Sequence, residues 1–302
     1  MILNPWYINF ILLLFIIGCE TPINRSNPLD PNVNSTRVLR VPTQFSTIQE
    51  AIDNSFDGDT IYIVTDVSGP GNYDITLQNK NLIIIGGMPD QDGWVFKNTI
   101  DCNFQGRGFL IEANNMKDSI TIENLAIKNG FNNGGGIYIN GGGVNIDTLT
   151  GNPDKKIKIN NVKIENCISP NDGGGLYLEH IKENFLEISN LDVWNCKAGS
   201  NGGGIYANRS DIKICNLDLS SNEAYNGGGF HGSLYDSNEI IINGVTCTSN
   251  RSLFSGGAMA FSGNTVFDNK VIIKKGFILH NEAEMRGGGI WNMYTNMIME
   301  DI

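Results

Sequence analysis

The sequence predicts an all-β fold, a single-stranded right-handed parallel β-helix (solenoid) with a short N-terminal capping helix, on three observations. Glycine is abundant (36 of 302 residues) and proline scarce (9), which favours tight turns and excludes collagen. A glycine motif recurs every 25 to 39 residues, a period typical of solenoids. Between its copies, apolar and polar residues alternate, as they do in strands with one buried face.

The net charge of the chain limits the classes of molecule that it is expected to bind. The formal net charge is −11, which repels nucleic acid overall, so no nucleic-acid partner is predicted. The charge is compatible with Ca²⁺ or with neutral glycans. No motif of clustered carboxylates supports a Ca²⁺ site, so neither a cofactor nor a metal is predicted.

The N-terminus indicates an export signal at residues 1–18. Its apolar run, Phe10 to Gly18, is too short to span a bilayer and is typical of a signal peptide. The run ends Ile16-Ile17-Gly18-Cys19 and resembles the bacterial lipobox. That resemblance implies acylation of Cys19 and a lipid-anchored protein at the periplasmic or cell-surface face of the outer membrane. The alternative is an ordinary signal peptide with an incidental cysteine. Residues 19–40 are rich in proline, asparagine and serine, which predicts a flexible tether.

Residue 41 begins the predicted β-helix, which we place at 41–302. Ile48, Ala51 and Ile52 form one apolar helical face, and Ser46 or Thr47 precedes them as a helix N-cap. A turn and an alternating strand follow at residues 58–63. This opening resembles that of the pectate-lyase-like superfamily, in which a small helix covers the first turn of the coil.

The repeat consists of a glycine triplet and a bent strand. The triplets start at residues 134, 173, 202, 227, 256 and 287, and an apolar residue follows each. The strand motif has two alternating halves, each ending in asparagine. It fits residues 120–129, 157–166 and 186–195, and it fits 212–222 and 240–250 with one inserted residue. The combination resembles repeats of chlamydial polymorphic outer-membrane proteins. The last copy stops at Ile302 in mid-turn, which predicts a truncated C-terminus or a partner on that edge.

Stacked turns place equivalent asparagines about 4.8 Å apart, close enough for their amides to form ladders. We interpret these asparagines as structural residues at the corners of the coil. One predicted ladder contains Asn124, Asn161, Asn190 and Asn216, and Gly244 breaks it. A second contains Asn129, Asn166 and Asn195 and is predicted to continue through Asn222, Asn250 and Asn281.

A column of rings follows the triplets and is the predicted ligand-binding surface. Each ring comes directly after the inward-facing apolar residue, so it is expected to point outward, as an exposed stripe for an extended glycan. The alternative is that the rings shield the backbone near the glycine corners. The predicted ligand-binding residues are Tyr138, Tyr177, Tyr206, His231 and Trp291.

Catalytic motifs of known β-helix enzymes are absent from the sequence. Five cysteines besides Cys19 cannot all pair within one chain, and no histidine is paired by motif with a nucleophile. We identify no pair of carboxylates for glycoside hydrolysis. The sequence therefore predicts no catalytic residues and favours an adhesive, structural or glycan-binding protein of the cell envelope. The alternative is a fragment of a polysaccharide lyase or glycoside hydrolase.

Overall fold

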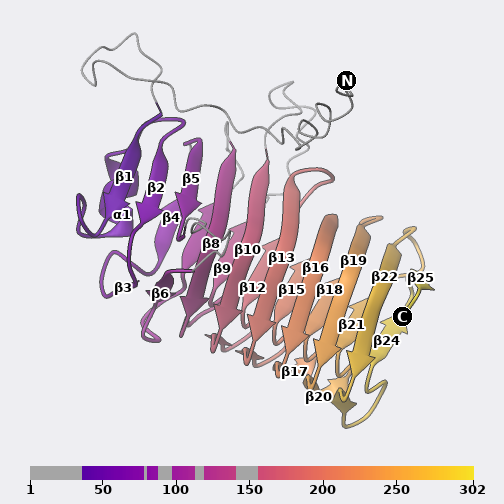
Figure 1. Ribbon diagram of the computed structural model, residues 1–302. Coiled ribbons are helices and arrows are strands. Elements are labelled where there is room, and N and C mark those ends of the chain that lie inside the picture. The colour runs from indigo at the N-terminus through magenta and orange to yellow at the C-terminus, as the bar shows by residue number, and fades with distance from the viewer. Residues whose placement is uncertain (1–35, 78–79, 88–96, 113–118, 141–155) are drawn as a thin grey trace, which may run out of the picture. The chain divides into compact units, whose positions relative to one another are not determined.

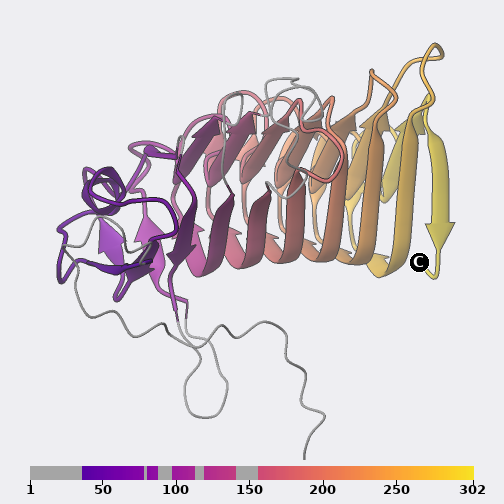
Figure 2. The same cartoon turned by 90° about the horizontal axis from the view of Figure 1, so that it is seen from above.

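The chain winds into a right-handed parallel β-helix of about 7 turns, as the repeats predict. The computed structural model describes residues 36–77, 80–87, 97–112, 119–140 and 156–302. Cys19 and the predicted signal peptide lie outside the described residues. Figures 1 and 2 show successive turns side by side along one axis. Each strand pairs in parallel with strands of neighbouring turns, and together they form three sheets.

The largest of the three, the bent sheet, has twelve strands. Its main path runs β1 (Val38–Val41), β2 (Thr60–Ile63), β5 (Leu82–Ile85), β8 (Ile120–Lys128), β10 (Ile157–Glu165), β13 (Leu186–Trp194), β16 (Ile212–Ser220), β19 (Glu239–Thr248), β22 (Lys270–Leu279), β25 (Asn296–Glu300). Two short strands lie off this path, β3 (Val67–Ser68) and β6 (Thr99–Asp101).

Two smaller sheets complete each turn. The straight sheet contains, in order, β24 (Ile290–Met293), β21 (Met259–Ser262), β18 (Phe230–Ser233), β15 (Ile205–Asn208), β12 (Leu176–Glu179), β9 (Ile137–Asn140), β7 (Phe109–Glu112), β4 (Ile75–Leu77). The small sheet contains β11 (Ile168–Ser169), β14 (Lys197–Ala198), β17 (Glu223–Asn226), β20 (Arg251–Ser255), β23 (Glu282–Ala283).

The long strands bend at a single residue in the left-handed conformation. This residue is Asn190 in β13 (φ 52°), Asn216 in β16 (φ 59°) and Gly244 in β19 (φ 82°). Asparagine and glycine tolerate this conformation better than most residues. Alternation resumes beyond the bend, so both halves of each strand point apolar side chains such as Ile188 and Leu191 into the core.

The glycine triplets stack from turn to turn, which confirms the prediction that they mark one line of bends. Backbone hydrogen bonds join them directly, for example from Gly135 N to Gly174 O at 3.0 Å. The packing leaves no room for a side chain: a Cβ at Gly203 would lie 2.4 Å from the carbonyl oxygens of both Glu223 and Gly228. Glycine is therefore required by the close approach of neighbouring turns.

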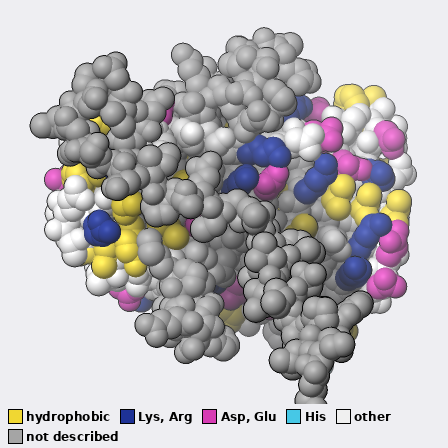
Figure 3. Space-filling model, turned by 45° about the horizontal axis from the view of Figure 1, so that its top comes forward, with side chains coloured by type: hydrophobic (Ala, Val, Ile, Leu, Met, Phe, Trp, Pro, Cys, Tyr) yellow, Lys and Arg dark blue, Asp and Glu magenta, His cyan; other side chains and the backbone are white. Residues whose placement is uncertain are grey.

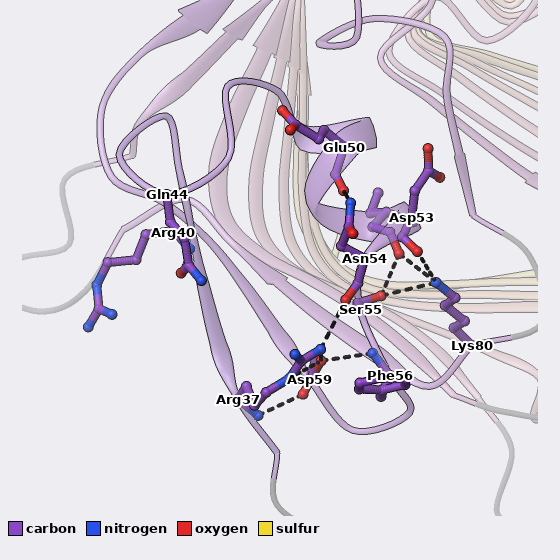
Figure 4. Close-up of polar contacts among 11 residues, drawn as sticks. Arg37, Arg40, Gln44, Glu50, Asp53, Asn54, Ser55, Phe56, Asp59 and Lys80 are labelled. Carbon is purple, nitrogen blue, oxygen red and sulfur yellow. Dashed lines mark hydrogen bonds and ion pairs between the residues drawn. The ribbon is translucent and has the colours of Figure 1, made fainter. Parts of the chain in front are cut away.

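The helix α1 (Ile48–Asp53) lies between strands β1 and β2 in the chain. Thr47 is its N-cap and accepts a hydrogen bond from Glu50 N at 3.1 Å, while Ile48, Ala51 and Ile52 are buried as predicted. At its C-terminal end, the Lys80 ammonium donates to the carbonyl oxygen of Ile52 at 2.6 Å (Figure 4). The helix contacts β1, β2 and β4. Its role as the end cap of the solenoid stays a prediction.

The first strand begins earlier than the sequence indicates. β1 starts at Val38, inside the segment 19–40 predicted as a tether, because Leu39 is buried and pairs in register with Ile61. An ion pair fastens this strand to β2, with Arg37 Nη2 lying 2.6 Å from Asp59 Oδ2 (Figure 4). Among the described residues, no helix has the length and apolar character needed to cross a membrane.

Candidate functional site

The predicted ring column exists. Tyr138, Tyr177, Tyr206 and His231 are register partners on β9, β12, β15 and β18, and Ala260 on β21 separates them from Trp291 on β24. Ring centroids are 5.0 Å apart from Tyr138 to Tyr177 and from Tyr177 to Tyr206, and 5.6 Å apart from Tyr206 to His231. The rings pack edge-on or tilted against one another, which is the favourable arrangement for aromatic pairs.

The expectation of an exposed stripe is wrong for the centre of this column. Tyr177 and Tyr206 are each 8% exposed and His231 is 5% exposed; only Tyr138 and Trp291 are half-buried. Tyr138 Oη donates to Glu179 at 2.5 Å, and Tyr206 Oη donates to Ser233 Oγ at 3.2 Å. Because Tyr177, Tyr206 and His231 are buried and pack against one another, a ligand cannot stack on these three central rings in this conformation.

Burial also sets the protonation of the column. It raises the pKa of Tyr206 to about 12 and lowers the pKa of His231 to about 4, so both are neutral at pH 7. Ser262 Oγ lies 3.4 Å from His231 Nε2, a pairing of hydroxyl and imidazole that no sequence motif indicated. His231 Nδ1 has no hydrogen-bond partner among the described residues. The part of the chain that the structure describes thus supplies no third member of a catalytic triad to orient this imidazole.

The first predicted ladder forms in part. Asn161 Nδ2 donates to Asn124 Oδ1 at 2.8 Å, and Asn216 Nδ2 donates to Asn190 Oδ1 at 3.0 Å. Between these two pairs, Asn190 donates to Asn160 instead of Asn161, at 3.1 Å. The ladder ends at Gly244 as predicted.

The second predicted ladder divides into two columns. Asn195 Nδ2 donates to Asn166 Oδ1 at 2.7 Å, and Asn129 Nδ2 donates to Asp101 Oδ1 at 2.9 Å. In the following turns, serine and then histidine occupy the same left-handed corner. The strand motif therefore ends one residue earlier than predicted there, and these turns contain no inserted residue. The corner residues there are Ser221 (φ 58°), Ser249 (φ 56°) and His280 (φ 57°).

Asn222, Asn250 and Asn281 therefore occupy the next position, in line with Cys167 and Cys196. Asn222 and Asn250 are buried there, and Asn250 Nδ2 donates to Asn281 Oδ1 at 2.9 Å and to Leu219 O at 2.7 Å. The prediction that these residues continue the outer ladder was wrong. They form a ladder of their own that satisfies backbone groups inside the coil.

A groove on the outer face of the bent sheet could hold a ligand. It has a volume of about 880 Å³ and crosses β13, β16, β19 and β22 at their bends. We call it the corner groove and define it by Asn190, Asp192, Asn216, Asp218, Thr246 and Phe277.

Four of these side chains form one outward column, because Asp192, Asp218, Thr246 and Phe277 are successive register partners. Three turn-to-turn steps give the column a length of about 14 Å. Phe277 is 67% exposed, so its ring is available to a ligand. The groove thus combines amides, carboxylates, a hydroxyl and an aromatic ring in a line.

The electrostatics of the groove centre on Asp192. Partial burial raises the pKa of Asp192, and the Asp218 carboxylate beside it raises this pKa further, while Lys163 and Lys97 act in the opposite direction. Lys163 is itself engaged, since its ammonium lies 2.6 Å from Glu165 and 5.7 Å from the ring centroid of Trp194. Figure 3 shows basic and acidic side chains next to one another over the C-terminal turns, with hydrophobic side chains between them.

The described part of the chain offers no obvious metal ligands. Within it, no group of three or more histidine, cysteine, aspartate or glutamate residues is placed to hold an ion. Cys167 and Cys196 are buried thiols on adjacent turns. Burial raises the pKa of Cys196 most, and the neighbouring Cys167 raises it further. The Cys196 thiol is therefore protonated at neutral pH and is a poor ligand and nucleophile.

Comparison with known proteins adds no relative: no family model, curated protein or solved structure matches the chain. The resemblance to pectate-lyase-like proteins and to polymorphic outer-membrane repeats stays a prediction from motifs. The fold and the corner groove are consequently the basis for a functional proposal.

Proposed function

We propose that this β-helix binds an extended glycan along the corner groove. The observation that carries the proposal is the alignment of Asp192, Asp218, Thr246 and Phe277 on four consecutive turns within one groove. Turns repeat about every 4.8 Å, close to the length of one sugar unit, so equivalent groups would meet successive sugars. Asparagine and aspartate bond hydroxyls, while an exposed aromatic ring packs on an apolar sugar face.

Phe277→Ala in the full chain tests the groove directly. A glycan array would identify ligands, and titration calorimetry on the strongest one would compare the variant with the unaltered protein. We expect Phe277→Ala to weaken binding about tenfold, because a stacking surface is lost. Val266→Ala is the matched control: Val266 is 79% exposed and lies outside the groove. Equal affinities for both variants would rule out the corner groove as the binding site.

A second candidate, glycoside hydrolysis, is favoured by one observation: two aspartates stand in register in the groove. Two nearby carboxylates are the groups that most glycosidases use, one as acid and one as nucleophile or base. The glycans that bind would be incubated with the protein and assayed for new reducing ends. Release that Asp218→Asn abolishes would establish hydrolysis in place of simple binding.

Export and lipid anchoring form the cellular part of the proposal. They depend on the apolar run at residues 10–18 and on the lipobox-like Cys19. Metabolic labelling of the expressed protein with a fatty-acid analogue tests them. Label that survives the Cys19→Ser substitution would refute anchoring at this residue.

A further inference from the structure

The corner groove contains an unusual pair of like charges. Asp192 and Asp218 are directly opposed on β13 and β16, and both point outward because their neighbours Leu191 and Leu217 are buried. Carboxylates placed directly opposite each other on neighbouring strands repel one another and destabilise the sheet. A pairing that lowers stability is often retained for function.

Elsewhere on the outer faces, several carboxylates form ion pairs with basic groups of the neighbouring turn. The pairs include Lys156–Glu187 at 2.5 Å, Lys270–Glu239 at 3.0 Å, Lys274–Glu300 at 3.0 Å and Arg251–Glu284 at 2.6 Å. Of the residues that the structure describes, none forms an ion pair with Asp192 or Asp218. The two aspartates therefore contrast with these cross-turn ion pairs.

The basic groups nearest to this pair do not compensate it fully. Lys163 is the register partner of Asp192 on β10, but its ammonium lies 2.6 Å from Glu165. Burial and then Asp218 raise the pKa of Asp192 overall, although the charges of Lys163 and Lys97 lower it. Lys275 lines the groove but lies two strands away from Asp218, and Asp301 lines the same end. The groove therefore has a negative centre that the nearby lysines compensate only in part, with amides on one side and the exposed Phe277 ring at one end.

We propose that the groove is selective for a cationic amino-sugar polymer, with ammonium groups of successive units at Asp192 and Asp218. This inference rests on the proposed glycan binding and adds the class of glycan. The turn spacing allows one ammonium per carboxylate, and each charge-assisted hydrogen bond would relieve the repulsion between the aspartates. A polyuronate would be repelled by the same two carboxylates.

The test compares three hexasaccharides on the full chain by titration calorimetry: glucosamine, N-acetylglucosamine and glucose oligomers, all β-1,4-linked. We expect the glucosamine hexamer to bind at least about tenfold more tightly than the other two. We expect Asp192→Asn and Asp218→Asn to remove that preference, so that the glucosamine hexamer binds no more tightly than the other two. Glu282→Gln, an exposed carboxylate on the small sheet, is the matched control and should keep the preference.

The outcomes separate this inference from the function beneath it. Equal binding of all three hexamers would overturn charge selection and leave glycan binding intact. Binding of no glycan at all would overturn both. Polylysine that competes with the glucosamine hexamer at equal charge concentration would indicate a basic peptide as the partner and would also overturn the inference. Unchanged circular dichroism spectra of the aspartate variants ensure that lost selectivity is not lost folding.

Discussion

Asp59 is the most enclosed charged group of the described coil. Its side chain is 0% exposed and accepts hydrogen bonds from Arg37 Nη2 at 2.6 Å, from Arg37 N at 2.7 Å and from Phe56 N at 2.8 Å. Removing the carboxylate takes this partner away from the backbone N–H groups of Arg37 and Phe56, and it leaves Arg37 Nη2 with only the carbonyl oxygen of Asn54. We predict that Asp59→Ala lowers the free energy of unfolding by about 3 kcal/mol in urea denaturation.

The exposed pair between Arg251 and Glu284 provides the comparison for Asp59. Glu284→Ala removes an ion pair of the same 2.6 Å length from the surface, where water and salt screen it. Its expected cost is about 0.5 kcal/mol. A loss for Asp59→Ala as small as this would contradict the assignment of Asp59 as a buried anchor.

Asp192 carries a prediction about pH. Because the folded state raises the pKa of this carboxyl, by burial and then by Asp218, ionisation is harder in the folded than in the unfolded chain. The resulting loss of stability is absent below the unfolded pKa and is fully present above the folded pKa. We predict that Asp192→Asn raises the free energy of unfolding at pH 7 by up to about 1 kcal/mol. Near pH 3, where Asp192 is protonated in both states, the gain should vanish. A variant less stable than the parent at pH 7 would refute the like-charge account.

At the scale of elements, the two kinds of asparagine column should respond differently to substitution. Asn250 is buried and its amide bonds Asn281 and Leu219, whereas Asn216 is exposed at a strand bend. We predict that Asn250→Ala costs about 3 kcal/mol, since it leaves buried backbone groups unsatisfied. Asn216→Gly should cost less than about 1 kcal/mol, because Gly244 already serves as the same corner one turn later. Thermal melts of both variants decide this, and similar losses would argue against two distinct columns.

Much of the element pattern could be predicted from residues alone. Alternation in Ile157 to Asn166 and Leu186 to Asn195 predicted strands that the structure places at Ile157–Glu165 and Leu186–Trp194. Period-two patterning works here because one face of every strand is buried. The sequence failed where a corner changed identity: Ser221 replaced asparagine, and its neighbour Asn222 was mistaken for the corner residue.

The functional surfaces were harder to predict. Alternation correctly placed Tyr177 and Tyr206 in one column, but their burial depends on packing between turns that a single strand does not contain. The corner groove was missed for the same reason. Asp192 and Asp218 are 26 residues apart, and only the register between β13 and β16 brings them together. A comparison of outward positions across aligned repeats is the signal that could have found them.

At the scale of the whole molecule, every proposal depends on one continuous coil with this register. Lys158, Glu187, Lys213, Ile241 and Ile272 are successive partners in one outward column of the bent sheet. Their separation should therefore grow by a constant step of about 4.8 Å per turn. A flat sheet with another strand order, or a shifted register, would give a different progression.

Pulsed electron-electron double resonance on pairs of nitroxide labels measures this progression most directly. Labels would be attached to cysteines introduced at Thr121, Lys158, Ile241 and Ile272, with the native cysteines replaced. The account predicts mean distances of about 19 Å between positions 158 and 272 and about 24 Å between positions 121 and 272, after four and five turn-to-turn steps. Distances that do not increase by one turn spacing per step would contradict the coil, and with it the corner groove.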